Sequence, residues 1–498
     1  MMTEPCDLSA VAARALIGQR KLSPVELTDS CIRRIEAVDP AVNAVVARSF
    51  ETARKSARER EAAVMRGDTL GAVHGLPLGV KDLIDAEELP TSFGSVLFAD
   101  NVASQDEAIV AMLKREGAIV IGKTNVPEWG AGGNTRNAVY GATGNPFDPN
   151  RSAAGSSGGS AVALATGMVS LATGSDTGGS VRNPASFCGV VGFRPSPGLI
   201  ASNSRNMAWL QISQLGPMAR TVSDACLMLS CMLDRDARDP LSAILHAGGA
   251  PSPVLYRNPL RVDLSALRIA ATTDFGFAPT EGAVARAFAQ KLTSFETVFR
   301  GVEWTHPDCT GADEVFSILR AVAFLGRHRE LVEKFPDKVG PNVRDNVAEG
   351  LGYSAADVAR ALSMQTDLYR RWQTFFADHD FILAPAVTIS PRPWSELYPA
   401  EIDGRPTKSY FHWLALAYAV TNVGHPTVAI PAGRDEAGLP FGIQVIGPRG
   451  GDLLTLAVAR EIEAVLAANP DTARPVPDIA WLAKQPPIAG KPGFLAFD

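Results

Sequence analysis

The segment "TGSDTGGSVRNPASFCG", residues 173–189, brings an aspartate, a threonine, two glycines, a serine and an arginine into one short run. A Gly-Gly pair directly before a serine lets the backbone fold tightly, so that consecutive N–H groups point into one concavity. Such a concavity stabilises negative charge on oxygen, and we expect it to form an oxyanion hole if Ser180 attacks a carbonyl. The expected donors are the N–H groups of Thr177, Gly178, Gly179 and Ser180. For an isolated Gly-Gly-Ser, a turn that only caps the next segment is the alternative.

A second Ser-Gly stretch and an isolated lysine strengthen the catalytic interpretation. The stretch is "AAGSSGGSA" at residues 153–161, and the lysine is Lys81 in "LPLGVKDLID". Lys81 is bracketed by apolar residues at a predicted strand end, and burial lowers the pKa of a lysine until its neutral amine can act as a base near pH 7. A serine nucleophile needs such a base, and Ser156 or Ser157 can relay its proton. A lysine that extends to solvent or pairs with the next aspartate is the alternative.

Other motif matches are weaker. Residues 117–124, "GAIVIGKT", match a phosphate-binding loop letter for letter, but the apolar middle predicts a buried strand. Residues 155–159, "GSSGG", match a nucleophile elbow, yet a turn-rich loop precedes them instead of a strand; such a hydrolase would pair Ser157 with a histidine such as His425. The histidines are scattered, and only His74 lies close enough to the Lys81 motif to line the same site.

Composition limits the class of protein. The 498 residues are 46% hydrophobic and 20% charged, which is typical of a soluble globular protein. A net charge of −6 argues against nucleic acid and anionic membrane surfaces as partners. The six cysteines form no Cys-x-x-Cys pair and no His-x-x-x-His occurs, so we expect no metal site and reduced core thiols in a cytoplasmic protein.

No signal peptide and no membrane span is expected from the apolar runs. The most apolar segment, "YFHWLALAYAV" at residues 410–420, is too short to span a bilayer and predicts a core or pocket helix. A membrane-touching or dimer surface is the alternative for this segment, so a homodimer stays open.

Periodicity predicts an α/β fold. Residues 7–66 are expected to be helical, with Ser23, Pro24 and Glu26 forming a capping box at one helix start. Further predicted helices cover residues 104–117, 160–174, 282–299, 310–380 and 453–466. Predicted strands fall within residues 76–84, 117–126, 267–276, 381–387, 426–433 and 441–447. Residues 234–262 are expected to be a surface connection.

With these motifs in place, the chain resembles the amidase signature family. The matching segments run from about residue 70 to 235, with one more near the C-terminus: "GLPLGVKDLID", "TSFGS", "GKTNVPEWG", "NTRNAVYGATGNPFDPNRSAAGSSGGSAVALATG", "GSDTGGSVRNPASFCGVVGFRPSPG", "GPMARTVSDA" and "LPFGIQVIG". The resemblance implies a Ser–Ser–Lys triad, in which Ser180 is the nucleophile, Ser156 the bridging serine and Lys81 the base. It also implies a cis peptide bond between Gly155 and Ser156.

The resemblance gives roles to neighbouring residues as well. Asp176, Arg182 and Ser157 are expected to hold the nucleophile loop in place by charge-assisted and other hydrogen bonds. Ala154 stands where many members have glycine, and we expect little effect because alanine is small.

The implied fold is a single large α/β/α domain over residues 1–498, with a mixed, mostly parallel central sheet flanked by many helices. Its expected parts are N-terminal helices at 1–66, a signature core at 70–235, a variable helical substrate region at 310–412 and an extended C-terminal tail at 469–498.

The implied activity is a serine amidohydrolase that cleaves the C–N bond of linear amides through an acyl-enzyme on Ser180, with no metal or cofactor. Gly130, Ala131, Gly132 and Trp209 are expected to line the substrate pocket. The open glycine wall and the net charge favour neutral aliphatic or aryl amides.

Three alternatives to this activity stay open. Carbamates (urethanes) or ureas could be cleaved by the same triad. The chain could also be the glutaminase subunit of a tRNA-dependent amidotransferase, although that subgroup carries "DEF" where this chain has "PEW" at residues 127–129. A non-catalytic binding protein would need a lost triad, and all its positions are intact.

Overall fold

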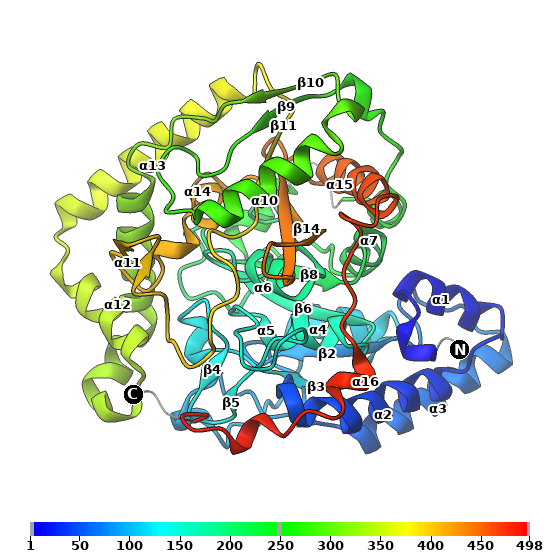
Figure 1. Ribbon diagram of the computed structural model, residues 1–498. Coiled ribbons are helices and arrows are strands. Elements are labelled where there is room, and N and C mark those ends of the chain that lie inside the picture. Colours follow the sequence, from blue (N-terminus) through cyan, green and yellow to red (C-terminus); the bar gives the residue numbers. More distant parts are fainter. Residues whose placement is uncertain (1–3, 247–250, 496–498) are drawn as a thin grey trace.

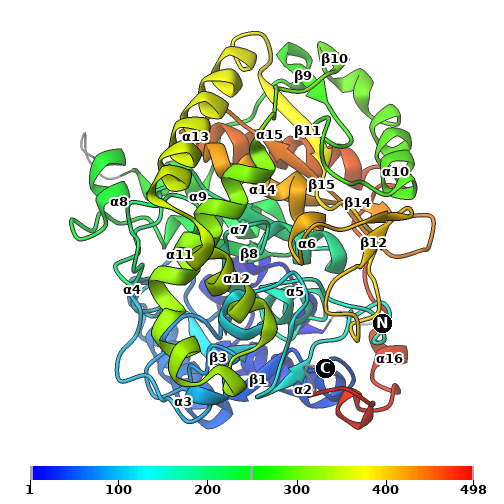
Figure 2. The ribbon, with the colours of Figure 1, turned by 90° about the vertical axis from the view of Figure 1, so that its left-hand side faces the viewer.

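A computed structural model describes residues 4–246 and 251–495. Its centre is one mixed sheet of 11 strands in the order β1-β3-β2-β6-β8-β7-β14-β15-β11-β9-β10, surrounded by helices (Figures 1 and 2). The predicted single α/β domain with a mixed sheet is therefore confirmed. The strands of this sheet are β1 (Val45–Arg48), β2 (Pro77–Lys81), β3 (Ile119–Thr124), β6 (Leu171–Asp176), β7 (Val191–Arg194), β8 (Gln214–Ala219), β9 (Arg268–Ala271), β10 (Gly301–Trp304), β11 (Phe381–Pro385), β14 (Thr427–Arg434) and β15 (Pro440–Ile446).

Sixteen α-helices and two small strand pairs complete the described chain. The small pairs are β4 (Arg136–Asn137) with β5 (Gly141–Ala142) and β12 (Glu401–Ile402) with β13 (Arg405–Pro406). The helices are α1 (Ala10–Gly18), α2 (Pro24–Val42), α3 (Phe50–Arg66), α4 (Ala108–Arg115), α5 (Gly158–Ala165), α6 (Arg182–Cys188), α7 (Val222–Ser230), α8 (Pro240–Leu245), α9 (Pro253–Arg257), α10 (Gly282–Thr293), α11 (Ala312–Lys334), α12 (Pro341–Gly352), α13 (Ala355–Phe375), α14 (Ala415–Val423), α15 (Asp452–Ala467) and α16 (Ile479–Leu482).

The strand directions correct one expectation, because the sheet is not mostly parallel. Parallel neighbours occur only toward its two ends, in β3-β2-β6 and in β11-β9-β10. Every contact in the middle, from β6 through β8, β7, β14 and β15 to β11, is antiparallel. A parallel pair needs a long crossover, whereas β14 and β15 are joined by the short turn at residues 435–439, which makes them a hairpin.

The N-terminal region is helical as predicted, with one added strand. The Ser23 side chain accepts from the N–H of Val25 and of Glu26, and Glu26 accepts from the Ser23 N–H at 3.1 Å, so the capping box is confirmed. Between α2 and α3 the chain forms β1, which pairs antiparallel with β3. Four residues between two helices give too short a pattern for sequence to reveal a strand.

The apolar stretch at residues 160–174 differs from the prediction of one buried helix. Helix α5 ends at Ala165, Gly167 turns the chain at φ +75°, and β6 begins at Leu171. Small apolar residues are buried in both elements, so the run alone cannot tell a helix from a strand.

The other predictions of elements hold well. Residues 310–380 form α11, α12 and α13, which face the viewer in Figure 2. The apolar segment at 410–420 is buried and leads into α14, which confirms a core helix. The six cysteines are buried and unpaired. Among the described residues, no helix is both long and apolar enough to cross a membrane.

The two connecting regions are only partly described. The expected surface connection at residues 234–262 carries α8 and α9, and residues 247–250 within it lie outside the described chain. The expected extended tail runs mostly without regular structure apart from α16, and its residues 496–498 also lie outside.

Candidate active site

Two parallel neighbours of the sheet bring the predicted catalytic segments together. Strand β2 ends at Lys81 and strand β6 ends at Asp176, and the two strands pair in parallel. Carboxyl ends of adjacent parallel strands lie at the same edge of a sheet, which is where ligand sites form in such folds. The loop that follows β6 carries Ser180, so it begins beside Lys81.

Lys81 is fully buried and surrounded by hydroxyl groups. Its Nζ lies 2.7 Å from Ser156 Oγ, 2.7 Å from Ser157 Oγ and 2.9 Å from Ser175 Oγ. Desolvation lowers the pKa of Lys81 to about 7, against the opposing effect of the negative Asp176. Near neutral pH the amine is therefore available in its neutral form, in which its lone pair can accept a proton from a serine.

Ser175 is a contact of Lys81 that the sequence analysis missed. It lies on β6 two residues after Thr173, whose Oγ1 accepts from the Lys81 N–H at 2.9 Å. Alternate residues of a strand point to the same face. The alternation would have identified Ser175 only if residues 171–176 had been recognised as a strand.

The serines of the candidate site open onto one cavity. A cavity of about 300 Å³ is lined by Ser156, Ser175, Thr177 and Ser180, together with residues of α11 and of the loops after β2 and β3. The peptide bond from Gly155 to Ser156 is cis, as the resemblance implied. The Ser157 N–H donates to the Ser180 carbonyl at 3.1 Å, which ties the two Ser-Gly loops together. Within the described chain the Ser180 hydroxyl makes no hydrogen bond.

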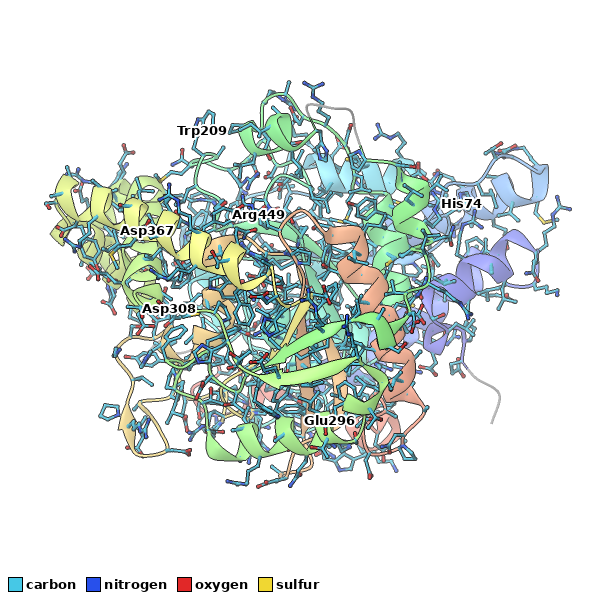
Figure 3. All side chains as sticks on the ribbon, turned by 90° about the horizontal axis from the view of Figure 1, so that it is seen from above. His74, Trp209, Glu296, Asp308, Asp367 and Arg449 are labelled. Atoms are coloured by element: carbon cyan, nitrogen blue, oxygen red, sulfur yellow. The ribbon has the colours of Figure 1, made fainter. Side chains whose placement is uncertain are left out.

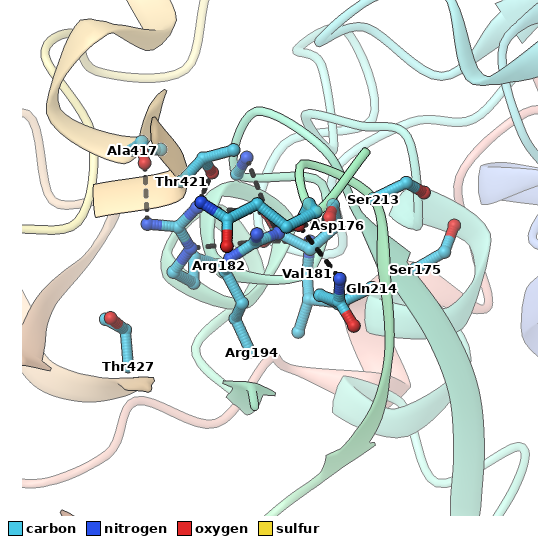
Figure 4. Close-up of polar contacts among 12 residues, drawn as sticks. Ser175, Asp176, Val181, Arg182, Arg194, Ser213, Gln214, Ala417, Thr421 and Thr427 are labelled. Carbon is cyan, nitrogen blue, oxygen red and sulfur yellow. Dashed lines mark hydrogen bonds and ion pairs between the residues drawn. The ribbon is translucent and has the colours of Figure 1, made fainter. Parts of the chain in front are cut away.

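Three buried charged residues, Asp176, Arg182 and Arg194, hold the loop that carries Ser180 in place (Figure 4). Arg182 donates to the Asp176 carboxylate from Nε at 3.1 Å and from Nη2 at 3.0 Å. Arg194 Nη1 lies 3.1 Å from Asp176 Oδ1. Burial alone would raise the pKa of Asp176, but the two guanidinium groups outweigh it and hold the pKa well below its usual range. Arg182 also donates to the carbonyl of Ala417 and the hydroxyl of Thr421 in α14, so the loop is fixed to the C-terminal half of the chain.

The Asp176 carboxylate also changes the expected set of oxyanion donors. It accepts the N–H of Gly179 at 2.9 Å, so in this structure that group is engaged within the loop, and Gly179 as an oxyanion donor stays a prediction. Thr177 and Ser180 line the cavity. Gly178 has no room for a side chain, because a Cβ there would lie 2.9 Å from Cζ of Phe316.

Only one of the four predicted pocket residues lines the cavity. Gly130 does so at φ +69°, where an added Cβ would lie 3.4 Å from Ser156 Oγ. Ala131 instead packs in a small cluster with Val339 and Val343, and a Cβ on Gly132 would meet Asn342. These two residues face α12 and do not line the cavity.

Trp209 also lies away from the site. Its side chain is 77% exposed and stands at the edge of the molecule (Figure 3). It is absent from the cavity wall, so its assignment to the pocket was wrong. Nothing in a surface loop of this kind distinguishes an outward from an inward tryptophan at the level of sequence.

The cavity has an aromatic wall that the sequence analysis did not find. The ring of Trp129 stacks on Phe93 with centroids 4.4 Å apart, and His328 and Phe324 of α11 extend this surface. Burial, with a smaller effect of Arg327, lowers the pKa of His328 to about 3, so this imidazole is neutral. Trp129 stands in the quoted "PEW" segment. Its contact with His328 of α11 joins residues that are far apart in the sequence, so no local pattern predicts it.

The weaker motif matches have structural explanations. Residues 117–124 include the buried strand β3, and no strand precedes Ser157, which stands directly before α5. His425 is fully buried, bonded to the Gly447 carbonyl at 2.7 Å and absent from the cavity wall. His74, labelled in Figure 3, lies 3.0 Å from the carbonyl of Arg60 and likewise does not line the cavity. In the described chain no group of three His, Cys, Asp or Glu residues could hold a metal ion.

Known proteins similar to this chain share most of its length. The model of the family described as Amidase matches residues 26–456. An acylamidase of Rhodococcus erythropolis is 32% identical over 465 residues, covering 92% of this chain and 95% of the relative. An indoleacetamide hydrolase of Bradyrhizobium diazoefficiens is 32% identical over 471 residues, covering 91% and 86%. The crystal structure of a bacterial aryl acylamidase superposes with a TM-score of 0.82 at 25% identity, covering 97% of this chain and 99% of that one.

Proposed function

The chain belongs to the amidase signature family and is an amide-cleaving hydrolase, and on this premise we propose that it cleaves linear amides through an acyl-enzyme on Ser180. The observation that carries the proposal is the buried Lys81, whose Nζ lies 2.7 Å from Ser156 Oγ at the wall of the cavity that Ser180 shares. A base of lowered pKa next to a relay hydroxyl and a nucleophilic hydroxyl is the arrangement that acyl transfer requires.

In acylation, neutral Lys81 accepts the proton of Ser156 while Ser156 accepts the proton of Ser180. The Ser180 Oγ forms a bond to the amide carbon, and the carbonyl π pair moves onto oxygen. The N–H groups of Thr177, Gly178 and Ser180 are the candidate donors to that oxyanion. The C–N bond then breaks, the nitrogen receives a proton from Lys81 through Ser156, and an amine or ammonia leaves.

In deacylation, water takes the place of the amine. Its proton passes to Lys81 along the same relay as its oxygen attacks the ester, and the bond to Ser180 Oγ then breaks. The proton returns to Ser180, and the carboxylic acid is released. Water is the only co-reactant, and atoms and charges balance over the cycle.

The aromatic wall supports aryl or aliphatic amides as substrates. Trp129, Phe93 and Phe324 give the cavity that contains Ser180 an aromatic wall, against which an aryl group can pack. The acylamidase and the aryl acylamidase among the relatives are named for such reactions. Carbamates and ureas present a similar carbonyl to the same serine and are the second substrate class to test.

A hydrolysis panel with the purified chain tests the proposal. The panel contains anilides, aliphatic amides, carbamates, ureas and glutamine, and we expect turnover of an anilide. Ser180→Ala should lower kcat by at least about 10³-fold, because the covalent step is lost. Ser186→Ala is the matched control, since its buried hydroxyl makes no hydrogen bond within the described chain.

A serine-directed phosphonate gives an independent readout. It should add one group to the peptide that carries Ser180, seen by mass spectrometry. An adduct on Ser157 would contradict the assignment, and faster turnover of glutamine than of the anilide would favour the amidotransferase alternative.

A further inference from the structure

Arg320 is a buried arginine on the cavity wall. It lies on α11, it is 4% exposed, and it lines the cavity that contains Ser180. Its Nε and Nη2 both donate to the hydroxyl of Tyr410, Nε at 2.8 Å. The rings of Phe324 and Tyr410 lie 4.7 Å and 5.0 Å from its Cζ. Its Nη1 has no acceptor within the described chain.

This arginine differs from the other buried arginines near the site in having no carboxylate. Arg182 and Arg194 share Asp176, and Arg205 pairs with Asp239. No ion pair of the described residues includes Arg320. Tyr410 does not supply the missing charge, because burial raises the pKa of its phenol. The aromatic rings around the guanidinium stabilise its charge only in part, and a negatively charged ligand would supply the counter-charge that is missing.

Arg320 lies close to the proposed nucleophile loop. The Phe316 ring lies 5.9 Å from Arg320 Cζ, and the same ring closes against Gly178 of the loop. Phe316 therefore lies next to both Arg320 and the proposed oxyanion loop. Since Arg320 and Ser180 also line the same cavity, one small substrate can reach both.

The acidic residues of the cavity do not offset this charge. Burial raises the pKa of Glu107, the charge of Asp85 adds to the rise and Arg327 opposes it, so Glu107 lies within range of both charges. Glu107 also accepts from Ser204 at 2.9 Å, in the loop after β7. The charge of Glu107 thus acts on Arg327, and no ion pair of the described residues links Asp85 or Glu107 to Arg320.

We propose that Arg320 is the binding residue for a carboxylate on the amide substrate. This rests on the proposed amidase function and names its substrate class: amides that carry a carboxylate a few bonds from the scissile carbonyl. Nη1 and the second hydrogen of Nη2 form the free end of the guanidinium fork, which matches the two oxygens of a carboxylate. The neutral substrates expected from the net charge are thereby revised, because local charge in the cavity acts on the substrate more strongly than the sum over the surface.

Two pairs of isosteric anilides test the proposal. N-phenylsuccinamate against 4-methylpentananilide places the charge on the acyl side, and 4-acetamidobenzoate against 4-isopropylacetanilide places it on the amine side. We expect the wild type to prefer the charged member of one pair by about 10-fold or more in kcat/KM, the effect of a charge-assisted hydrogen bond. The pair that shows the preference identifies the side that Arg320 holds.

Substitutions then assign the preference to Arg320. Arg320→Met should reduce the charged-to-neutral ratio by roughly 10- to 100-fold, mainly through KM, and Arg320→Lys should restore part of it. Arg329→Met is the matched control, because Arg329 lies on the same helix, is exposed and pairs with Glu333. Equal kcat/KM within both pairs in the wild type, or a preference that survives in Arg320→Met, would overturn the proposal.

A binding experiment separates this proposal from the proposed function. In Ser180→Ala protein, calorimetry should show that N-phenylsuccinamate or 4-acetamidobenzoate binds about 10-fold or more weakly once Arg320→Met is added. Binding that depends on Arg320 without turnover in the wild type would count against the proposed reaction alone. Turnover of both neutral anilides with no binding difference would count against the carboxylate subsite alone.

Discussion

Lys81 Nζ and Ser156 Oγ lie 2.7 Å apart although 75 positions separate the two residues in the chain. The contact depends on the pairing of β2 with β6 and on the loop that enters α5. It brings the proposed base and the proposed relay hydroxyl into contact before any substrate binds. The pH dependence of the reaction follows from this pair.

The rate should rise with pH through the pKa of Lys81. Desolvation lowers this pKa to about 7, so the ammonium form, which cannot accept a proton, dominates at lower pH. We expect kcat/KM for a neutral anilide to rise about tenfold per pH unit below this value and to level off above it. Initial rates between about pH 5 and 9 measure the profile. A flat profile through this range would show that Lys81 is not the base.

The relay predicts that amides depend on Lys81 more than esters do. An amine leaving group must receive a proton, whereas an alkoxide can leave with less help. Lys81→Met should therefore lower kcat/KM for an anilide at least about tenfold more than for the matched phenyl ester. Lys81→Arg should behave in the same way, because arginine stays charged. Equal losses on both substrates would contradict the proton path.

Trp129 and Trp209 provide a matched pair of substitutions. Trp129→Leu removes a ring from the cavity wall and should raise KM for an anilide roughly tenfold while affecting acetamide much less. Trp209→Leu changes an exposed side chain outside the cavity and should leave both substrates unaffected. Steady-state kinetics of both variants on the anilide and on acetamide show which of the two tryptophans lines the substrate pocket. An effect of Trp209→Leu alone would return the pocket to the position predicted from sequence.

Asp176→Asn should destabilise the fold as well as the loop. It leaves Arg182 and Arg194 buried without their shared counter-charge, which costs about 3–5 kcal/mol. Asp367→Asn is the control, since its pair with Arg370 is exposed and is worth less than about 1 kcal/mol. Urea unfolding midpoints measure both, and equal midpoints would contradict a stabilising role for the triad of charges.

The pH dependence of that stabilisation has a definite sign. The pKa of Asp176 is held below its unfolded value, so the contribution is complete above roughly pH 4 and is lost as the pH falls toward the folded pKa. The difference in unfolding midpoint between wild type and Asp176→Asn should therefore shrink in acid.

The sequence predicted the parts of the site that depend on local pattern. The capping box at Ser23, the strands around Lys81 and the buried strand at residues 117–124 follow from residue type and spacing. The proximity of Lys81 to Ser156 could be expected only through the family resemblance. No local pattern encodes the pairing of β2 with β6.

The errors concern features that depend on distant contacts or on backbone conformation. Ala131 turns toward α12, and the middle of the sheet is antiparallel because of how its strands connect. The small size of Ala154 predicts little effect, yet its backbone lies at φ +56°, where a Cβ costs about 1–2 kcal/mol relative to glycine. Arg320 stood in the predicted substrate region, but only the structure shows that it has no carboxylate partner.

The division of the cavity between two parts of the chain has a consequence for how this protein can diversify. The proposed reacting groups come from the end of β2 and from the loops after β6 and before α5, whereas Arg320, Phe324 and His328 of the cavity wall come from α11. The two parts meet where Phe316 covers Gly178. Exchanging α11 for the corresponding helix of a relative, with Phe316 kept, should change the part of the substrate preference that α11 sets, while the part set by Trp129 and Phe93 stays in place. One helix is therefore a compact target for directed evolution of the substrate preference.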